Sequence, residues 1–229
     1  MLAPRKKLWS TPSSAIDVAL DFAQPLDDHD VVYDVGCGDG RVLIQMASRS
    51  IPRVSDDDKT IDCGNKTNSN SKKASQQSPL PIHHHYCKQF IGIEISPERA
   101  EEARSNIRHA QETNQIPSHV SIEIICANAL DTDSIDYSRA TVIFLYLVPR
   151  GLRLIKPIVW PKEEDALENH DDSLTGILSK LRLRQKKDRF RRVITYMSPF
   201  EDEVYVRKEL CRVDHQVGAA WPVYLYHIK

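Results

Sequence analysis

The chain has 229 residues, a formal net charge of −1, a hydrophobic fraction of 41% and a charged fraction of 28%. This composition is ordinary for a soluble globular protein, and its charge gives no overall attraction to nucleic acid. No apolar run approaches the roughly 18 residues of a membrane span, so we expect no transmembrane segment. The length suits one domain over residues 1–229 that carries insertions.

The cysteine pattern and the N-terminus bear on the compartment. Five scattered cysteines form no C-x-x-C pair, which suits a reducing compartment. No apolar run follows Arg5, Lys6 and Lys7, so a secretory signal is not expected. We expect a cytoplasmic protein, with a mitochondrial one as the alternative because no acidic residue precedes Asp17.

The first predicted elements are a helix from Ser13 onward and a buried strand over 31–35 that contains Asp34. Three glycines at alternate positions follow, and then a helix over 41–47. Glycines allow positive φ and close approach of a ligand to the backbone, at the strand end where α/β sheets bind ligands. A dinucleotide fingerprint would need its third glycine at position 41, which is Arg41, so the spacing disfavours a nicotinamide dehydrogenase.

A second strand is predicted over 90–95, with Glu94 near its end and a helix opened by Ser96 and Pro97. An acid at this place accepts hydrogen bonds from ribose hydroxyls, usually about 20 residues after the glycine loop. Here Glu94 lies about 54 residues after Gly40, and the polar, aperiodic segment 52–86 explains the excess. Such a segment buries too little apolar surface to offset its ordering entropy, so we expect a disordered insertion.

The remaining chain alternates as an α/β fold should. Strands are predicted over 120–126, 140–148 and 192–198, and helices over 149–160 and 174–187, separated by a smaller acidic insertion at 160–174. Two last strands, over 204–213 and 223–228 with a turn around Gly218, read as an antiparallel hairpin.

The run Asp34-x-Gly36-x-Gly38-x-Gly40 resembles the first motif of class I S-adenosylmethionine-dependent methyltransferases. The segments Leu8–Pro12, Leu145–Pro149 and Ser198–Phe200 are similar to small protein-lysine methyltransferases of the ATP synthase c-subunit and adenine nucleotide translocase type. The resemblance implies an α/β, Rossmann-like, mostly parallel seven-stranded sheet that ends in the hairpin. It also implies S-adenosylmethionine as the cofactor. This chain lacks the apolar N-terminal segment of the mitochondrial relatives.

The same resemblance implies the cofactor contacts. Asp34 supplies negative charge near the ligand's ammonium, and Glu94 binds the ribose. Asn128 stands where relatives often carry an acid for the adenine amino group, and its carbonyl can accept the same bond. The full set of predicted cofactor contacts is Asp34, Gly36, Cys37, Gly38, Gly40, Glu94, Ile95, Asn128 and Ala129.

The end of the fourth strand suggests an aliphatic amine as the methyl acceptor. The Asp/Asn-Pro-Pro-aromatic run typical of enzymes that methylate amide or base nitrogens is replaced by Leu145–Pro149. A lysine amine must be neutral to react, and an aromatic, apolar cleft favours the neutral form. We expect Tyr146 and Pro149 at the catalytic position and Trp9 and Thr11 at the substrate. Tyr146 could instead be a core aromatic, and Trp9 a hydrophobic staple for the first helix.

Other readings stay open. The acceptor could be a small molecule or RNA, although nucleic acid is the less favoured partner, or the chain could bind the cofactor without catalysis. Neither a metal site at the three histidines of 83–85 nor a nucleophilic Cys37 is expected, because consecutive histidines rarely share an ion and Cys37 has no evident base. The basic run within 182–192 is predicted to be a solvated helix face, with recruitment of an acidic partner, RNA or an anionic membrane surface as the alternative. The oligomeric state is left open.

Overall fold

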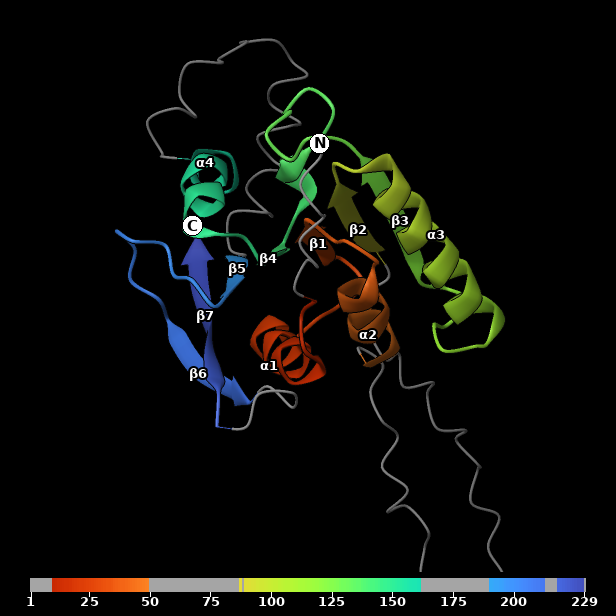
Figure 1. Ribbon diagram of the computed structural model, residues 1–229, viewed down its shortest axis with the longest axis horizontal. Coiled ribbons are helices and arrows are strands. Elements are labelled where there is room, and N and C mark those ends of the chain that lie inside the picture. Colours follow the sequence, from red (N-terminus) through yellow and green to blue (C-terminus); the bar gives the residue numbers. More distant parts are fainter. Residues whose placement is uncertain (1–9, 50–86, 88, 162–189, 213–217, 229) are drawn as a thin grey trace, which may run out of the picture.

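The computed structural model describes residues 10–49, 87, 89–161, 190–212 and 218–228. Seven strands form one sheet in the order β3-β2-β1-β4-β5-β7-β6 (Figure 1). Strands β1 to β5 run parallel to one another, and β7 pairs antiparallel with both β5 and β6. The strands are β1 (Val31–Val35), β2 (Gln89–Glu94), β3 (Ser121–Cys126), β4 (Val142–Leu145), β5 (Arg191–Tyr196), β6 (Arg207–Arg212) and β7 (Ala220–Ile228).

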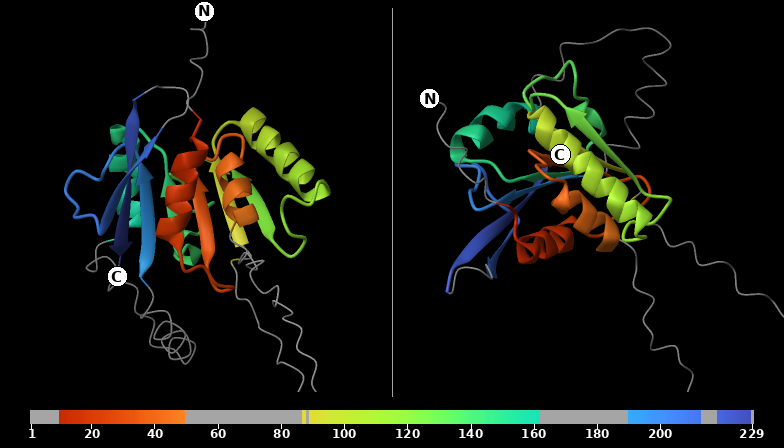
Figure 2. Two further views of the ribbon diagram at one scale, coloured as in Figure 1. Left: turned by 90° about the horizontal axis from the view of Figure 1, so that it is seen from below. Right: turned by 45° about the vertical axis from the view of Figure 1, so that its right-hand side comes forward.

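The central strands are buried on both faces because helices cover the sheet on each side. Every residue of β1 and of β4 is buried, which explains their nearly continuous apolar sequence. Helices α1 (Ser13–Ala23), α2 (Arg41–Arg49) and α3 (Pro97–Glu112) lie on one face of the sheet, and α4 (Pro149–Val159) lies on the other (Figure 2).

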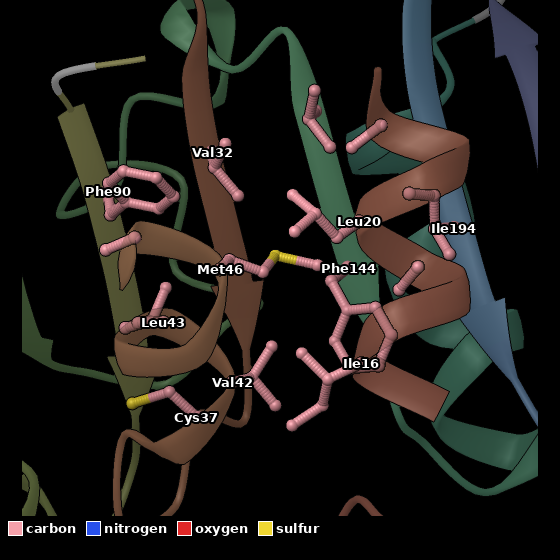
Figure 3. Close-up of a cluster of buried hydrophobic side chains, with 14 of the residues drawn as sticks. Ile16, Leu20, Val32, Cys37, Val42, Leu43, Met46, Phe90, Phe144 and Ile194 are labelled. Carbon is pink, nitrogen blue, oxygen red and sulfur yellow. The ribbon is translucent and has the colours of Figure 1, made fainter. Parts of the chain in front are cut away.

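Each face of the sheet has its own hydrophobic cluster. On the α1 and α2 side, Ile16, Leu43 and Met46 pack against sheet residues that include Phe90 and Phe144 (Figure 3). On the α4 side, a second cluster is built from Tyr33, Ile143, Leu152, Ile155 and Tyr226, among others. The alternation of strand residues between the two clusters fixes which side chains reach each face of the sheet.

A buried ion pair joins the strands at the end of the sheet opposite the glycine loop. Asp30 is 2% exposed, and its Oδ1 accepts bonds from Arg192 Nη2 at 2.6 Å and from Thr141 Oγ1 at 2.7 Å. The neighbouring Arg191 donates to three backbone carbonyls, of Tyr137, Ala140 and Val159. These bonds tie the starts of β1, β4 and β5 together.

Within the described residues the predicted elements are present, with shifted ends. The strand expected over 140–148 spans only Val142–Leu145, because a short 3-10 helix at Tyr137–Arg139 precedes it and α4 follows soon after. The strand expected over 192–198 ends at Tyr196, where the backbone turns at Met197. In the hairpin, β6 begins later than predicted and β7 begins earlier, and the turn at Gly218 has φ of 83°.

Two sequence predictions fall on residues outside this description. The predicted helix over 174–187 and the insertion at 52–86 lie there entirely, and the acidic insertion at 160–174 lies there from position 162. Within the described ranges, no helix is both long and apolar enough to cross a membrane.

Candidate functional site

The loop between β1 and α2 is bent by its three glycines. Gly36, Gly38 and Gly40 have φ of 81°, 56° and 80°, a region that favours residues without a Cβ. The loop is fixed to β2, because the amides of Gly36 and Cys37 donate to the carbonyl of Ile93 at 2.8 and 3.0 Å. The backbone therefore turns sharply at the carboxyl end of β1, as the sequence predicts.

Glu94 closes the other side of this loop. Its side chain is 6% exposed, and its Oε2 accepts from the Gly38 amide at 3.0 Å while Oε1 accepts from the Ser96 amide at 2.9 Å. A carboxylate has about four lone-pair positions, so each oxygen can accept a further bond. Ser96 occupies the N-cap of α3 as predicted, but its side chain makes no capping bond.

Asp34 is a buried carboxyl group with one oxygen that lacks a hydrogen-bond partner within the described residues. It is 2% exposed, and its Oδ2 has no hydrogen-bond partner within the described residues. Burial raises the pKa of Asp34 to about 8, with smaller contributions from the charges of Asp39 and Glu94. A cationic ligand group beside Oδ2 would both supply a partner and favour the ionised form.

These groups surround a small hollow above the loop. Its walls include Thr11, Asp34, Gly36, Gly38, Arg99 and Tyr146. The hollow thus brings together the glycine loop, the β1 acid, the start of α1 and the end of β4, which lie far apart in the sequence. A ligand with an ammonium and an adjacent reactive group would meet Asp34 on one side and Tyr146 on the other.

The remaining predicted cofactor contacts lie at the ends of β2 and β3. Ile95 is 66% exposed, although it is a large apolar residue. The amide of Ala127 donates to the carbonyl of Glu94 at 3.1 Å, so the two strand ends are adjacent. Asn128 Oδ1 accepts from the amide of Leu130 at 3.1 Å, and Ala129 is half-buried beside it. The side-chain oxygen of Asn128 thus stabilises the local turn through Leu130. The predicted contact of this oxygen with adenine stays a prediction.

The residues predicted for the acceptor do not all fall in one place. Thr11 is 7% exposed and lines the hollow with Tyr146. Pro149 is exposed in the first turn of α4. Trp9 lies outside the described residues.

Tyr146 stands against a second aromatic ring that sequence reasoning did not single out. Its ring centroid lies 4.8 Å from that of Tyr196, at an interplanar angle of 60°. Burial raises the pKa of Tyr146 above its usual value, so its phenol is protonated at neutral pH. The group can orient a neighbouring polar atom, and it cannot serve as a ready base.

Met197, which follows Tyr196, has a backbone conformation that the sequence alone did not reveal. It has φ of 69°, and the amide of Ser198 donates to the carbonyl of Tyr196 at 3.0 Å, which defines a strained γ-turn. Strand alternation would place residues 196 and 197 on opposite faces, yet both pack against the cluster on the α1 side, as does Tyr146. The turn therefore redirects Met197 toward the same face of the sheet as Tyr146 and Tyr196, and no sequence signal marks a non-glycine residue for this conformation.

Gly92 in β2 was likewise not recognised. A Cβ at this position would lie 2.6 Å from Ile124 Cδ1, 2.8 Å from Cys37 Sγ and 2.8 Å from Leu43 Cδ1. The missing side chain leaves room for Cys37 of the glycine loop and for Leu43 at the start of α2, both labelled in Figure 3. The sequence did carry a signal for this packing, because an isolated glycine inside a predicted strand often marks a place where another segment packs closely against the backbone.

Cys37 packs as a small apolar residue. It is 5% exposed, and burial raises the pKa of its thiol, reinforced by the charges of Asp34 and Glu94. A thiol held protonated is a poor nucleophile. In the described part of the chain no three potential metal ligands come together, and the histidines of 83–85 lie outside it.

The segment Ser198–Phe200 has a packing role on the opposite face. Phe200 is 3% exposed and meets Trp160 and Tyr226 edge to face, and its amide donates to Tyr226 Oη at 3.0 Å. This segment joins β5 to the α4 side of the sheet.

Comparisons with known proteins agree with this architecture. No protein-family profile matches the chain. A protein from Saccharolobus islandicus (strain REY15A) named protein-lysine N-methyltransferase is 29% identical over 147 residues, which are 64% of this chain and 63% of that protein. The match thus spans less than two thirds of the relative's length.

Solved structures share the fold. An RNA methyltransferase from Salinibacter ruber, solved with S-adenosyl-L-homocysteine, aligns with a TM-score of 0.54 at 20% identity over 96% of this chain and 94% of its own. Sp1610 of Streptococcus pneumoniae, a candidate tRNA (m1A22) methyltransferase, aligns with a TM-score of 0.50 at 13% identity over 96% of this chain and 71% of its own. Together with the strand order, these likenesses establish the class I methyltransferase fold expected from the sequence.

Proposed function

We propose that this chain is an S-adenosylmethionine-dependent methyltransferase that acts on the amine of a protein lysine. The observation that carries the proposal is the buried Asp34, whose Oδ2 has no partner within the described residues, beside a glycine loop that Glu94 holds open. The cofactor is a cation with an ammonium, a ribose and an adenine, and each of these groups has a matching feature here.

The fit to the cofactor follows from charge and shape. Asp34 gains a cationic partner that its burial otherwise denies it. The free lone pairs of Glu94 suit ribose hydroxyls, and the exposed Ile95 offers an apolar surface to an adenine ring. The positive φ of Gly36 and Gly38 brings bare backbone to the amino acid part of the ligand.

The bound cofactor supplies an electrophilic methyl carbon on a sulfonium, which is already a good leaving group. The protein has to hold an amine in line with that carbon and to keep the amine neutral. Tyr146 lines the hollow and its ring packs on that of Tyr196, and such an aromatic surface lowers the pKa of an amine by desolvation. An amine held there would accept the methyl group through its lone pair, with its new N–C bond replacing the C–S bond of the donor, and the excess proton on nitrogen would leave to solvent.

Two observations favour a protein lysine as the acceptor. The relative from Saccharolobus islandicus carries that name, and the end of β4 lacks the Asp/Asn-Pro-Pro-aromatic run of enzymes that methylate amides or bases. One domain over residues 1–229 and the two insertions form part of this proposal.

The test is incubation of the purified chain with methyl-labelled S-adenosylmethionine and cell lysate, followed by mass spectrometry of the labelled molecules. We expect label on the side-chain nitrogen of a protein lysine. Label confined to nucleic acid or to small molecules would overturn the lysine assignment. Tight S-adenosylhomocysteine binding without any transfer would favour the non-catalytic alternative. Glu94→Gln and Asp34→Asn serve as controls, because each removes a charge from the cofactor site while keeping the side-chain shape.

A further inference from the structure

Arg99 lies over the glycine loop from the first turn of α3. A Cβ atom placed on Gly38 would lie 3.7 Å from Arg99 Nη1, and Arg99 lines the same hollow as Asp34 and Tyr146. Its side chain is half-buried. The guanidinium is therefore held at the mouth of the loop, within reach of any molecule that lies against the glycines.

The neighbouring arginines have their partners, and Arg99 differs from them. Arg41 binds both carboxylate oxygens of Asp39, with Nε at 3.0 Å from each. Arg104 and Arg108, farther along α3, both pair with Glu101. Within the described ranges Arg99 makes no hydrogen bond or salt bridge, and its charge acts on Asp39 only at longer range, where it helps to hold the pKa of that carboxyl low.

The two walls of the hollow thus carry complementary polar groups. Asp34 offers a carboxyl oxygen without a hydrogen-bond partner within the described residues, and Arg99 offers a planar set of N–H donors. A guanidinium matches a carboxylate through two parallel hydrogen bonds, a geometry that a lysine cannot reproduce. A zwitterionic amino acid group has both complementary charges on one carbon atom.

We propose that Arg99 binds the α-carboxylate of the methyl donor, while Asp34 attracts its ammonium. This assignment deepens the proposed function and rests on it. It gives the site a means to recognise the amino acid end of the ligand separately from its adenosine end. Arg99 is then a cofactor-binding residue in addition to those predicted from the sequence.

Two ligands separate this role from a structural one. S-adenosylhomocysteine contains the amino acid group, and 5′-methylthioadenosine keeps the adenosine and the thioether but lacks the ammonium and the carboxylate. Isothermal titration calorimetry of both ligands is carried out with the full chain and with Arg99→Gln, Arg99→Lys and Arg108→Gln. Arg108 is the matched control, because it is an exposed arginine on the same helix.

We expect Arg99→Gln to weaken S-adenosylhomocysteine binding by about 10- to 100-fold and to leave methylthioadenosine binding within about twofold. Arg99→Lys should recover part of the loss, and Arg108→Gln should bind both ligands as the wild type does. Thermal unfolding of each variant verifies that it is folded.

Three outcomes would overturn the assignment. Unchanged S-adenosylhomocysteine affinity in Arg99→Gln removes Arg99 alone and leaves the proposed function standing. An equal loss for both ligands shows that Arg99 acts on the loop or on the adenosine end. If the wild-type chain binds neither ligand, the proposed function fails together with this assignment.

Discussion

The two halves of the site are built in different ways. The proposed donor half, around β1 and β2, consists of bare backbone and the buried acids Asp34 and Glu94, held by bonds such as that from the Gly38 amide to Glu94. The proposed acceptor half, around the ends of β4 and β5, consists of Tyr146 and Tyr196, whose rings are in contact, with Met197 packed on the same face of the sheet. The donor half is polar, and its residues come from two neighbouring strands that are close in sequence except for the predicted insertion at 52–86. The acceptor half is aromatic and apolar, and its residues Tyr146 and Tyr196 lie about 50 positions apart.

The difference has a chemical reason. A charged donor with fixed shape needs placed hydrogen-bond partners and charges, and a short motif can supply them. An amine that must lose its charge needs desolvation, which many arrangements of apolar side chains provide. The donor half therefore keeps a recognisable spacing, whereas the acceptor half depends on which side chains the fold brings together.

The largest effect is expected for Tyr146→Ala, which tests whether methyl transfer can be lost while cofactor binding is kept. It removes the ring that packs on Tyr196 and faces the hollow, so we expect transfer to fall by about 100-fold or more while S-adenosylhomocysteine affinity is unchanged. Tyr146→Phe keeps the ring and isolates the role of the hydroxyl. Single-turnover kinetics measure the rate of methyl transfer, and calorimetry measures S-adenosylhomocysteine affinity. A transfer rate equal to that of the wild type in Tyr146→Ala would leave Tyr146 with a packing role alone.

Gly92→Ala tests whether the donor loop depends on the packing beneath it. The added methyl group would overlap Ile124, Cys37 and Leu43, so we expect a loss of about 1–3 kcal/mol in the free energy of unfolding. Adding Cys37→Ala should recover part of the loss by removing one of the three contacts. Urea denaturation gives the values, and a neutral Gly92→Ala would show that the loop does not need this space.

The raised pKa of Asp34 should make the stability of the folded chain depend on pH. Its pKa is about 8 in the folded chain and near 3.8 when unfolded, so the folded state binds more protons between these values and stability falls as pH rises from about 4 to 8. Asp34→Asn should flatten this fall and be more stable at pH 8 by about 1–3 kcal/mol. The variant should also bind S-adenosylhomocysteine more weakly.

The raised pKa of Asp34 also predicts how S-adenosylhomocysteine binding depends on pH. A ligand ammonium favours ionised Asp34, so binding should release a proton and tighten as pH rises toward 8. Calorimetry in buffers of different ionisation enthalpy measures the proton release. The Asn variant should show none of it, and equal release by both proteins would contradict the role of Asp34.

The smallest expected effect concerns the turn in the acceptor half. At an ordinary strand position alanine is more stable than glycine by about 0.5–1 kcal/mol. At Met197, with φ of 69°, we expect the reverse, with Met197→Gly more stable than Met197→Ala by about 1 kcal/mol. Thermal unfolding of the two variants gives the sign directly, and greater stability of the alanine variant would mean that the turn carries no strain.

Several features could be predicted from the sequence because they depend on local patterns. The glycines after Asp34 required positive φ, and Glu94 could be assigned to the strand end once the insertion was set aside. The alternation of apolar segments and the terminal turn at Gly218 predicted a parallel sheet with an antiparallel hairpin. Strand ends were less accurate, since the turn at Met197 ended β5 two residues early.

The rest was decided by contacts between distant segments. Arg99 reaches Gly38 only because α3 begins beside the loop, and Tyr146 meets Tyr196 only because β4 and β5 are neighbours. Whether Asp34 Oδ2 finds a partner depends on every group packed around it. Local sequence determines backbone conformation and the period of burial, whereas burial itself, and with it the raised pKa of Asp34, arises only when the sheet is assembled.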